Sequence, residues 1–434
     1  MADCLDEVGT PTLPNLRHLR AFSLTARLKS VKRAAAEIYL SQPAVTQAIA
    51  NLEALYGHVF FDRTSGGMFL TEIGEIFLRR VDRALADLSR ACLPPETNGS
   101  RDGLPDASRL LTASHIRVVI ALSDHAGLDQ AARALGTSRA SIQRTTRNIE
   151  AALGGKLFIR SSTGIRLSET GAQLSRGAKL AARELELAQE EIEQFLGQKV
   201  GRMVVGSLPL SLIEVVPLAL MKLLDEIPDL SVRVIEGPYG NQLDGLRNGD
   251  IDMMVGALRT PAPTEDVVQR PLFDDPLSVV VRVGHPLTRL KSVTLSDTVG
   301  YAWVLPRRGT PTRSLFHRAF RRRALAEPKR LLEISSHASV RSILLGSDRV
   351  GLISRRQIRF EEEAGLITVL PIDLPEATRP IGLTMRADWV PSQAQKMFIR
   401  ELESLAGAYA GDEKATGDQP GINRIRMGTF PAPG

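Results

Sequence analysis

Apolar residues recur at helical spacing near the start of the chain. Residues 31–38, VKRAAAEI, are rich in alanine and predict a short helix, after which Ser41 is placed to cap a second one. Val45, Ile49 and Leu52 share one face of that second helix, which we therefore expect to be buried. The opposite face is predicted to point outward and carries Gln42, Thr46, Gln47 and Ala50.

This pattern occurs a second time. Residues 16–74 recur without a gap 97 positions later, and sixteen residues over 18–74 are identical in the two copies. The identities concentrate at small residues and turn glycines, where a helix-turn-helix needs close approach. In the second copy Ser138 is the predicted cap, and the outward positions become Arg139, Gln143, Arg144 and Arg147. Three neutral positions have thus become arginines.

Each copy continues in the same way. Residues 61–70 and 158–167 predict two short strands around a glycine turn, a wing that would bring Arg63, Arg160 and Arg166 near the DNA backbone or minor groove. A long helix follows each wing, and its apolar residues alternate spacings of four and three, which is typical of a coiled-coil seam. The alternative is a surface helix docked on its own domain. The seam residues are Phe77, Val81, Ala84, Leu88 and Ala91 in the first copy, and Leu174, Ala178, Ala181, Leu185, Ala188, Ile192 and Phe195 in the second.

Composition shifts predict the domain boundaries. Proline, glycine and polar residues mark a linker, and short strand-like runs alternate with helical ones from about residue 200. The predicted organisation is a first winged helix-turn-helix with its linker helix over 15–92, a flexible linker over 93–110, a second winged unit over 111–171, a dimerisation helix over 172–197, an effector domain over 200–407 with lobes 200–283 plus 380–407 and 284–379, and a disordered tail over 408–434.

Length and composition narrow the class of protein. A chain of 434 residues is too long for one core, and 43% apolar with 24% charged residues is typical of globular proteins. The sequence has no apolar run long enough to span a membrane and no secretory leader at its start, so we expect a cytoplasmic protein. Cys4 and Cys92 lie far apart, and we expect neither a disulfide nor a metal site. A net charge of +6 is compatible with nucleic-acid binding.

Charge placement separates the two copies. Neutralisation of phosphates supplies most sequence-independent affinity for DNA, and arginine also reads guanine through two hydrogen bonds. The arginine face of the second copy is therefore expected to bind DNA more strongly. Two alternatives stay open: either unit is only a packing or dimerisation module, or the first unit, with its neutral Gln42, Thr46 and Gln47, has lost DNA affinity and contacts another partner.

The run SQPAVTQAIANLEALYGHVFFDRTSGGMFLTEIGE at 41–75, echoed at 138–171, resembles the DNA-binding end of LysR-type transcriptional regulators. The second half is similar too, in GRMVVGSLPL at 201–210, LRNGDIDMMVGAL at 246–258, GHPL at 284–287 and VGLISR at 350–355. The chain departs from the family in having two winged units, and in Arg139 where the motif usually has glutamine. The expected DNA-binding residues are Ser41, Gln42, Pro43, Thr46, Gln47, Arg63, Ser138, Arg139, Ser141, Gln143, Arg144, Arg147, Arg160 and Arg166.

The resemblance implies two winged helix-turn-helix domains rich in α-helix, with long linker helices, followed by a two-lobed α/β domain of the periplasmic-binding-protein type with a small-molecule effector in its cleft. Ligands of α/β folds lie at strand ends beside helix N-termini, which favour an anion such as a carboxylate. The effector is expected to be an organic acid or a sugar, and each serine or threonine could instead be only a helix cap. The candidate cleft residues are Ser207, Leu208, Pro209, Leu258, Arg259, Pro306, Thr310, Arg313, Ser336 and Ser339.

Enzyme motifs are missing from the sequence. Its seven histidines form no cluster with ligand spacing, and it has no nucleophile elbow, phosphate-binding loop or redox motif. We therefore expect no catalytic residues, metal or cofactor, but a ligand-responsive regulator that binds double-stranded promoter DNA as a homo-oligomer, a dimer or tetramer. RNA polymerase stays open as a further partner. The rival classes are a solute-binding protein whose N-terminal helices serve assembly and an architectural protein that coats DNA.

The two seams suggest one further hypothesis. Because both copies retain a seam helix, the two winged units of one chain are predicted to pair as a pseudo-dimer. Fewer chains would then cover an extended operator than in the usual tetramer of the family.

Overall fold

The computed structural model describes residues 13–64, 67–93, 106–125, 127–161, 164–198, 201–208 and 214–415. The chain forms two compact bodies. Of these described residues, the first body holds those up to 206 together with 227–252 and 390–394, and the second holds the others.

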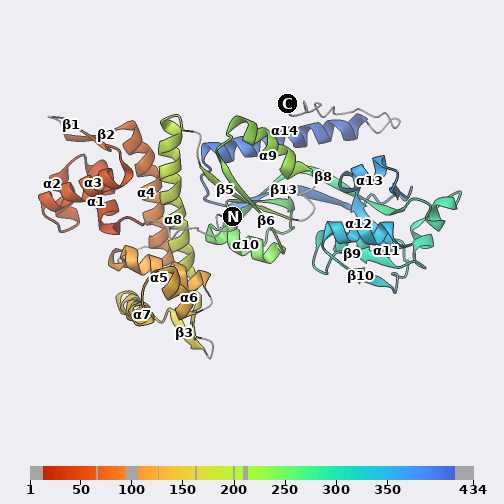
Figure 1. Cartoon of the computed structure of the whole chain (residues 1–434), viewed down its shortest axis with the longest axis horizontal. Coiled ribbons are helices and arrows are strands. Elements are labelled where there is room, and N and C mark those ends of the chain that lie inside the picture. The colour runs from red at the N-terminus through yellow and green to blue at the C-terminus, as the bar shows by residue number, and fades with distance from the viewer. Residues whose placement is uncertain are drawn as a thin grey trace, which may run out of the picture. The chain divides into compact units, whose positions relative to one another are not determined.

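The first body contains the same succession of elements twice: three short helices, a hairpin and a long helix (Figure 1). The first set consists of α1 (Leu16–Leu28), α2 (Val31–Glu37), α3 (Gln42–Tyr56), β1 (Phe61–Thr64), β2 (Gly67–Leu70) and α4 (Glu72–Ala91). The second set consists of α5 (Ala113–Asp124), α6 (Leu128–Ala134), α7 (Arg139–Leu153), β3 (Phe158–Ser161), β4 (Gly164–Leu167) and α8 (Glu169–Phe195).

The long helix of each set begins in the same way. Thr71 and Ser168 accept hydrogen bonds from the backbone N–H groups of Gly74 and Gly171, three residues further on. A β-carbon on Gly74 would lie 2.2 Å from the carbonyl oxygen of Phe60, and one on Gly171 would lie 2.1 Å from that of Leu157. Glycine is therefore required twice, because the long helix starts directly against the backbone that leads into the hairpin.

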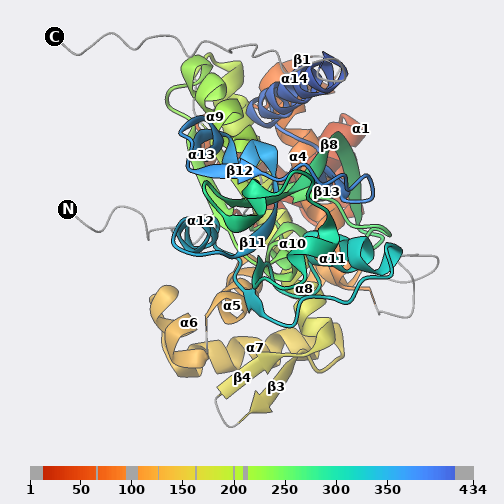
Figure 2. The same ribbon diagram turned by 90° about the vertical axis from the view of Figure 1, so that its right-hand side faces the viewer.

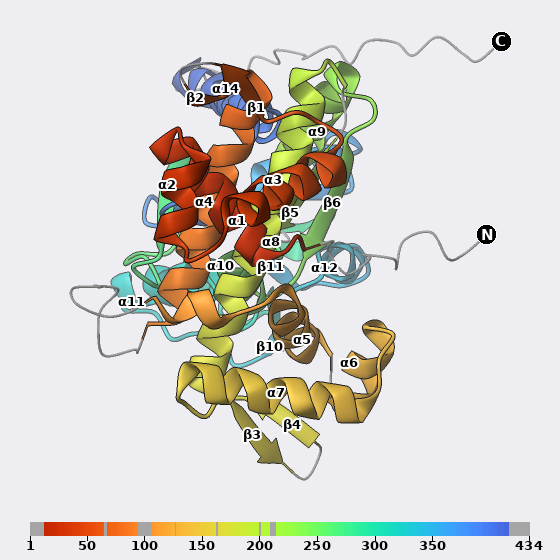
Figure 3. The ribbon, with the colours of Figure 1, turned by 90° about the vertical axis from the view of Figure 1, so that its left-hand side faces the viewer.

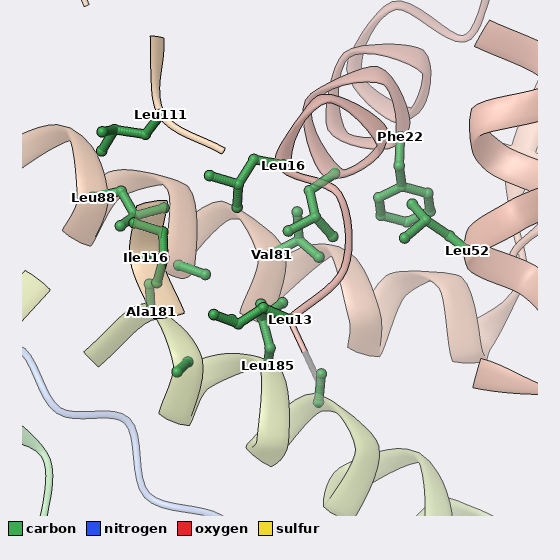
Figure 4. Close-up of a cluster of buried hydrophobic side chains, with 14 of the residues drawn as sticks. Leu13, Leu16, Phe22, Leu52, Val81, Leu88, Leu111, Ile116, Ala181 and Leu185 are labelled. Carbon is green, nitrogen blue, oxygen red and sulfur yellow. The ribbon is translucent and has the colours of Figure 1, made fainter. Parts of the chain in front are cut away.

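One apolar core runs through the two sets (Figure 4). Phe22 and Leu52 lie in the core of the first set, and Leu16 and Val81 join it to the long helices. Leu88, Ile116 and Ala181 continue the same cluster into the second set. Burial of this kind stabilises a fold by about 25 cal/mol per Å² of apolar surface. The core therefore ties both sets into one body.

The rest of the first body is a small α/β part formed by β5 (Arg202–Ser207), β6 (Ser231–Glu236) and α10 (Tyr239–Asn248). Arg183 of α8 attaches to it, because its guanidinium lies 3.3 Å from a carboxylate oxygen of Asp252 and donates to the carbonyl of Arg202. Burial lowers the pKa of Arg183, but the charges of Asp252 and Glu190 outweigh that effect and leave the pKa raised.

The second body is built on a mixed sheet with the order β10-β9-β11-β8-β13-β7, with β12 paired to β8. Strands β8, β11, β12 and β13 of this sheet are labelled in Figure 2. Strands β9, β10 and β11 are parallel to one another, whereas β8 is antiparallel to β11, β12 and β13. The elements are α9 (Val215–Glu226), β7 (Met253–Ala257), β8 (Val267–Arg282), β9 (Trp303–Leu305), α11 (Pro311–Arg322), β10 (Leu331–Glu333), α12 (His337–Leu345), β11 (Val350–Ser354), α13 (Arg359–Glu363), β12 (Ile367–Val369), β13 (Thr378–Arg386) and α14 (Gln393–Ala415).

Two predicted boundaries were wrong. Helix α14 continues past Gly407 to Ala415, because Leu402, Ala406 and Tyr409 extend its buried stripe and the Tyr409 ring lies 5.2 Å from that of Phe273. The predicted tail from 416 onward lies outside the described residues.

The linker predicted over 93–110 is also partly folded. Residues Ala107–Leu110 form a 3₁₀ turn capped by Asp106, and Ser108 is buried. Arg20 of α1 donates a hydrogen bond of 2.6 Å to the carbonyl of Ser108, a contact that local composition does not reveal.

Candidate nucleic-acid interface and effector site

Helix α3 presents the polar face predicted for the first set. The Ser41 hydroxyl accepts the N–H of Ala44 at 3.3 Å, and the helix ends at Gly57 in the left-handed conformation. Its inner residues are buried, whereas Ser41, Gln42, Pro43 and Gln47 are exposed and Thr46 is half-buried. Gln47 donates to the side chain of Asn51 at 2.9 Å, which holds its amide along the helix surface.

Helix α7 is the counterpart in the second set. The Ser138 hydroxyl accepts the N–H of Ser141 at 3.1 Å, and Gly154 ends the helix as Gly57 ends α3. Of the predicted DNA-binding residues on this helix, Arg139, Ser141, Arg144 and Arg147 are exposed, and Gln143 is half-buried.

One of these arginines has a neighbouring acid. Arg139 lies 3.6 Å from Asp129, but both side chains are more than half exposed. Such a surface pair contributes only about 0–1 kcal/mol, so it does not prevent Arg139 from meeting a phosphate or a base.

The hairpins after α3 and α7 are antiparallel and short. Arg166 is exposed and lies opposite Ile159 in the β3–β4 pair. The side chains of Arg63 and Arg160, the other predicted wing contacts, lie outside the described part of the structure.

A pair of glutamates that the sequence analysis missed fixes each hairpin to its helix. Glu53 of α3 accepts the N–H of Phe60 at 2.8 Å, and Glu150 of α7 accepts those of Leu157 and Phe158 at 2.9 and 3.1 Å. The two residues occupy equivalent positions, 97 apart, and are identical in the two copies. That identity on a half-exposed polar position was the available signal.

The predicted effector residues in the second body fall into two groups. Pro306 and Ser336 follow the parallel neighbours β9 and β10, and the N–H of Ile334 bonds to the carbonyl of Leu305 at 2.9 Å. The N-termini of α11 and α12 therefore begin at the same edge of the sheet. Thr310 and Ser336 cap those helices by accepting the N–H groups of Arg313 and Ser339.

Arg313, another of the predicted effector residues, is buried at the start of α11. It is 4% exposed, its guanidinium donates to His317 at 3.1 Å and to the carbonyl of Pro306 at 3.4 Å, and Glu333 lies 3.9 Å away. The Arg313 guanidinium therefore has hydrogen-bond partners within the protein and holds the start of α11.

The other group surrounds the end of β7. The backbone of Leu208 bonds to Val255 at 3.0 Å, and that of Leu258 bonds to Pro380 at 2.9 Å. Ser207 and Leu208 are buried, and the backbone of Arg259 is held on both sides by the Gln269 amide at 2.8 and 2.7 Å. Pro209 lies outside the described residues. None of the hydrogen bonds named for this group reaches Pro306, Thr310, Arg313, Ser336 or Ser339.

A buried charged cluster at the same strand edge was not predicted. Arg379 of β13 donates to Asp275 of β8 at 2.6 and 3.0 Å and to the Thr312 hydroxyl at 2.7 Å, while the Ser354 hydroxyl donates to Asp275. Burial lowers the pKa of Arg379, and the Asp275 carboxylate opposes that shift. The cluster joins α11 and β11 to the two long strands through partners more than sixty residues apart, which no local pattern reveals.

Two features are not found among the described residues. No helix within them combines the length and apolar character needed to cross a membrane. Over the same ranges, histidine, cysteine and acidic side chains do not gather in threes as a metal site would require.

Comparison with known proteins identifies the class to which this fold and site belong. The model of the LysR substrate binding domain matches residues 196–406, and that of the bacterial regulatory helix-turn-helix protein, lysR family, matches 16–75 and 113–172. The chain therefore has an N-terminal helix-turn-helix and a C-terminal two-lobed substrate-binding domain, which defines a DNA-binding transcriptional regulator with an effector-binding domain rather than an enzyme.

Individual relatives agree. The HTH-type transcriptional regulator GalR of Pseudomonas putida is 33% identical over 382 residues, which covers 88% of this chain and 95% of the relative. The HTH-type transcriptional regulator PcaQ of Agrobacterium fabrum is 26% identical over 293 residues, 68% of this chain and 94% of the relative. Full-length OxyR from Pseudomonas aeruginosa, a cysteine-to-aspartate variant, shares the fold with a TM-score of 0.51 at 23% identity, covering 67% of this chain and 97% of that one. The chain belongs to the LysR family of transcriptional regulators.

Proposed function

We propose that the chain carries two winged helix-turn-helix units and reads promoter DNA with both α3 and α7. The same succession of elements, caps and glycines in the two sets supports a duplicated unit. The length of the GalR match supports it too. Residues 109–434 number only 326, so a match of 382 residues extends into the first set.

The observation that carries the proposal is the arginine face of α7. Arg139, Arg144 and Arg147 are exposed along one serine-capped helix, and Arg166 is exposed on the hairpin that follows. A helix of this kind enters the major groove, where arginine forms two hydrogen bonds with guanine, while the flanking cations neutralise phosphates. Helix α7 therefore supplies the larger share of the affinity for DNA, and helix α3 contributes through amide and hydroxyl groups.

The test removes the three arginines together. Arg139→Ala, Arg144→Ala and Arg147→Ala in one chain should weaken binding to the preferred genomic fragment by more than about a hundred-fold, since a good base contact is worth about 1–3 kcal/mol. The matched control is Arg318→Ala, Arg321→Ala and Arg322→Ala on exposed positions of α11, which removes the same charge from the second body.

Gel-shift titration at one fixed salt concentration compares the two triple variants. The α11 control should bind within about three-fold of the unmodified chain, because charges distant from the duplex are screened. Equal losses in both variants would show that net charge, and not the α7 face, carries the affinity. Retention of full affinity by the α7 variant would contradict the proposal.

We further propose that the effector is a small organic acid or sugar held in a periplasmic-binding-protein-like cleft of the C-terminal domain. The support is the shared edge of β9 and β10, where two serine- or threonine-capped helices begin and their N-termini favour an anion. Within this edge, Ser339 is exposed in the first turn of α12, and its backbone N–H is already used by the Ser336 cap. Its hydroxyl is the group best placed to meet a ligand.

Thermal unfolding of the full chain tests the effector. Panels of carboxylic acids and of sugars are screened first, because a bound ligand raises the melting temperature by mass action. Ser339→Ala should then reduce the shift given by the best compound, whereas Ser342→Ala, an exposed serine one turn later in α12, should leave it unchanged. A full shift in the Ser339 variant would place the ligand elsewhere.

We propose that the chain acts as a homo-oligomer, as members of this family do. We also propose RNA polymerase as a further partner at regulated promoters. Transcription in vitro from a bound promoter, with and without the chain, would test this. An unchanged transcript level at saturating occupancy would count against it.

A further inference from the structure

Helices α4 and α8 pack against each other in antiparallel orientation. Arg80, near the middle of α4, contacts Glu184 and Glu191 in the second half of α8, whereas the Gln173 amide at the start of α8 donates to the carbonyl of Leu93 at the end of α4. Figure 3 shows the two helices side by side, with the hairpins β1–β2 and β3–β4 at opposite ends of the pair. The two sets are thus arranged head to tail about the middle of the pair.

The register of this pair follows the sequence repeat. Ala84 and Ala181 are equivalent positions, 97 apart, and both are buried near the middle of the two helices. Arg80 is equivalent to Gly177, and Asp87 to Glu184. The contact of Arg80 with Glu184 is therefore the counterpart of the approach of Gly177 to Asp87. A pseudo-two-fold axis relates the sets, as a true two-fold axis relates the subunits of a symmetric dimer.

The two halves of the pair differ chemically. Arg80 is 1% exposed, and Arg83 also donates to Glu184, at 2.9 Å. Burial lowers the pKa of Arg80, but hydrogen bonds and charge from Glu191 and Glu184 outweigh that effect and leave it raised. At the other end, a β-carbon on Gly177 would lie 2.3 Å from that of Ala91 and 2.8 Å from the carbonyl oxygen of Asp87.

These differences favour pairing of α4 with α8 over pairing of either helix with a second copy of itself. The arginines that satisfy Glu184 are present on α4 only, and the glycine that permits the close approach is present on α8 only. Two α8 helices together would leave Glu184 without either arginine, at a large cost for a buried charge. In a pair of two α4 helices, Arg80 would take the position of Gly177. A β-carbon there already comes within 2.3 Å of that of Ala91, so the two helices could not approach as closely.

The paired sets present unlike reading faces. The equivalent outward positions are Gln42 and Arg139, Thr46 and Gln143, Gln47 and Arg144, and Ala50 and Arg147. A true dimer repeats one face and reads an inverted repeat. Here the axis relates a neutral face to a cationic face, so the two base sequences that satisfy them must differ.

We propose that each pair of sets binds an operator with two dissimilar half-sites, one read by α3 and the other by α7. This inference rests on the proposed function and adds the symmetry of the DNA. The α7 half-site should be rich in guanine, which arginine prefers, whereas the α3 half-site should contain adenine opposite the glutamines.

Selection from a random duplex pool with the purified full chain tests the proposal. An enriched consensus without inverted-repeat symmetry, with one guanine-rich half, is the expected result. An enriched inverted repeat would overturn the inference while leaving the proposed function intact. Failure to enrich any sequence over random competitor would refute the proposed function, and the inference with it.

Two reciprocal variants sharpen the test by making the faces alike. Gln42→Arg, Thr46→Gln, Gln47→Arg and Ala50→Arg in one chain copy the α7 face onto α3. Arg139→Gln, Gln143→Thr, Arg144→Gln and Arg147→Ala in another copy the α3 face onto α7. Most of these positions are exposed, so the fold should be kept, and the two variants change net charge in opposite directions.

Each reciprocal variant should now select an inverted repeat, of the α7 half-site in the first variant and of the α3 half-site in the second. Each should also bind its own repeat at least about ten-fold better than the original operator, because one half-site is now mismatched. Selection of the original asymmetric consensus by either variant would show that these residues do not determine the half-sites.

Discussion

The two helical sets of the first body share a backbone arrangement but differ in their core side chains and in the charge of their exposed helix faces. In the first set Phe22, Phe60 and Phe77 pack with ring centroids 4.3 to 5.4 Å apart. The equivalent positions in the second set hold the smaller Val119, Leu157 and Leu174, all buried. The first set therefore has an aromatic core beneath a neutral reading face. The second has an aliphatic core beneath a cationic one.

The features common to both sets show what the plan requires. Serine caps, the glycine at the start of each long helix and the glutamate that holds each hairpin are retained. Core volume and surface charge have changed around them. Backbone-determining contacts thus constrain the unit more tightly than either the size of its core or the chemistry of its outer face.

The largest expected effect comes from the aromatic core. Phe22→Ala should lower the free energy of unfolding by about 3–5 kcal/mol, because it leaves a cavity among three rings. Val119→Ala, at the equivalent position, removes two methyl groups at about 0.8 kcal/mol each. Denaturant unfolding of the full chain followed by a signal from the first body measures both. Equal losses would mean that the aromatic packing adds nothing to stability.

Salt dependence should separate the two reading faces next. Changing Arg139, Arg144 and Arg147 to alanine should reduce the slope of log affinity against log salt by about 0.9 for each of them that contacts a phosphate, whereas an arginine bound to guanine contributes mainly to specificity. Over a four-fold rise in salt, the unmodified chain would then lose about 3.5-fold more affinity than the variant for each such phosphate contact. Changing Gln42, Thr46 and Gln47 to alanine should leave the slope unaltered. A comparable drop in that variant would show that the α3 and α7 faces do not differ in their salt-dependent contacts with DNA.

The sequence allowed much of this comparison to be predicted. Local signals were sufficient for the caps Ser41 and Ser138 and for the buried stripes of α3 and α7, because helix periodicity and capping are short-range properties. The seam helices were also visible from spacing. Their pairing within one chain was only a hypothesis from the sequence, since spacing does not identify the partner.

What could not be predicted depends on contacts distant in sequence. Arg80 meets Glu184 and Glu191 more than a hundred residues away, and Arg379 meets Asp275 across a similar separation. A charged residue at such a position looks like an ordinary surface residue until the fold brings its partners together. The burial of Arg313, which stays a predicted ligand contact, could not be read from the sequence for the same reason.

A smaller effect should come from the hairpin glutamates. Glu53→Ala should cost about 1.5 kcal/mol, the lower end for a hydrogen bond to a charged group, because the side chain is only half-buried. Glu150→Ala should cost more, since Glu150 accepts two N–H groups where Glu53 accepts one. Glutamine at either position keeps an acceptor and should restore most of the loss. The unfolding free energies of the four variants test this prediction. A larger loss for Glu53→Ala than for Glu150→Ala would contradict the expectation that two hydrogen bonds contribute more than one.

The smallest expected effect concerns two histidines at equivalent positions, His18 and His115. Burial lowers the pKa of each below the ordinary value of 6.5. The folded chain therefore binds a proton less readily than the unfolded chain, so stability is full above about pH 6.5 and declines as the pH falls below it. The Nδ1 atom of His115 is buried with no hydrogen-bond partner among the described residues, so protonation should cost more there than at His18. His115→Gln should flatten the fall in unfolding free energy between pH 7 and pH 5, and His18→Gln should flatten it less. If the unfolding free energy of the unmodified chain rose between pH 7 and pH 5, the predicted sign would be wrong.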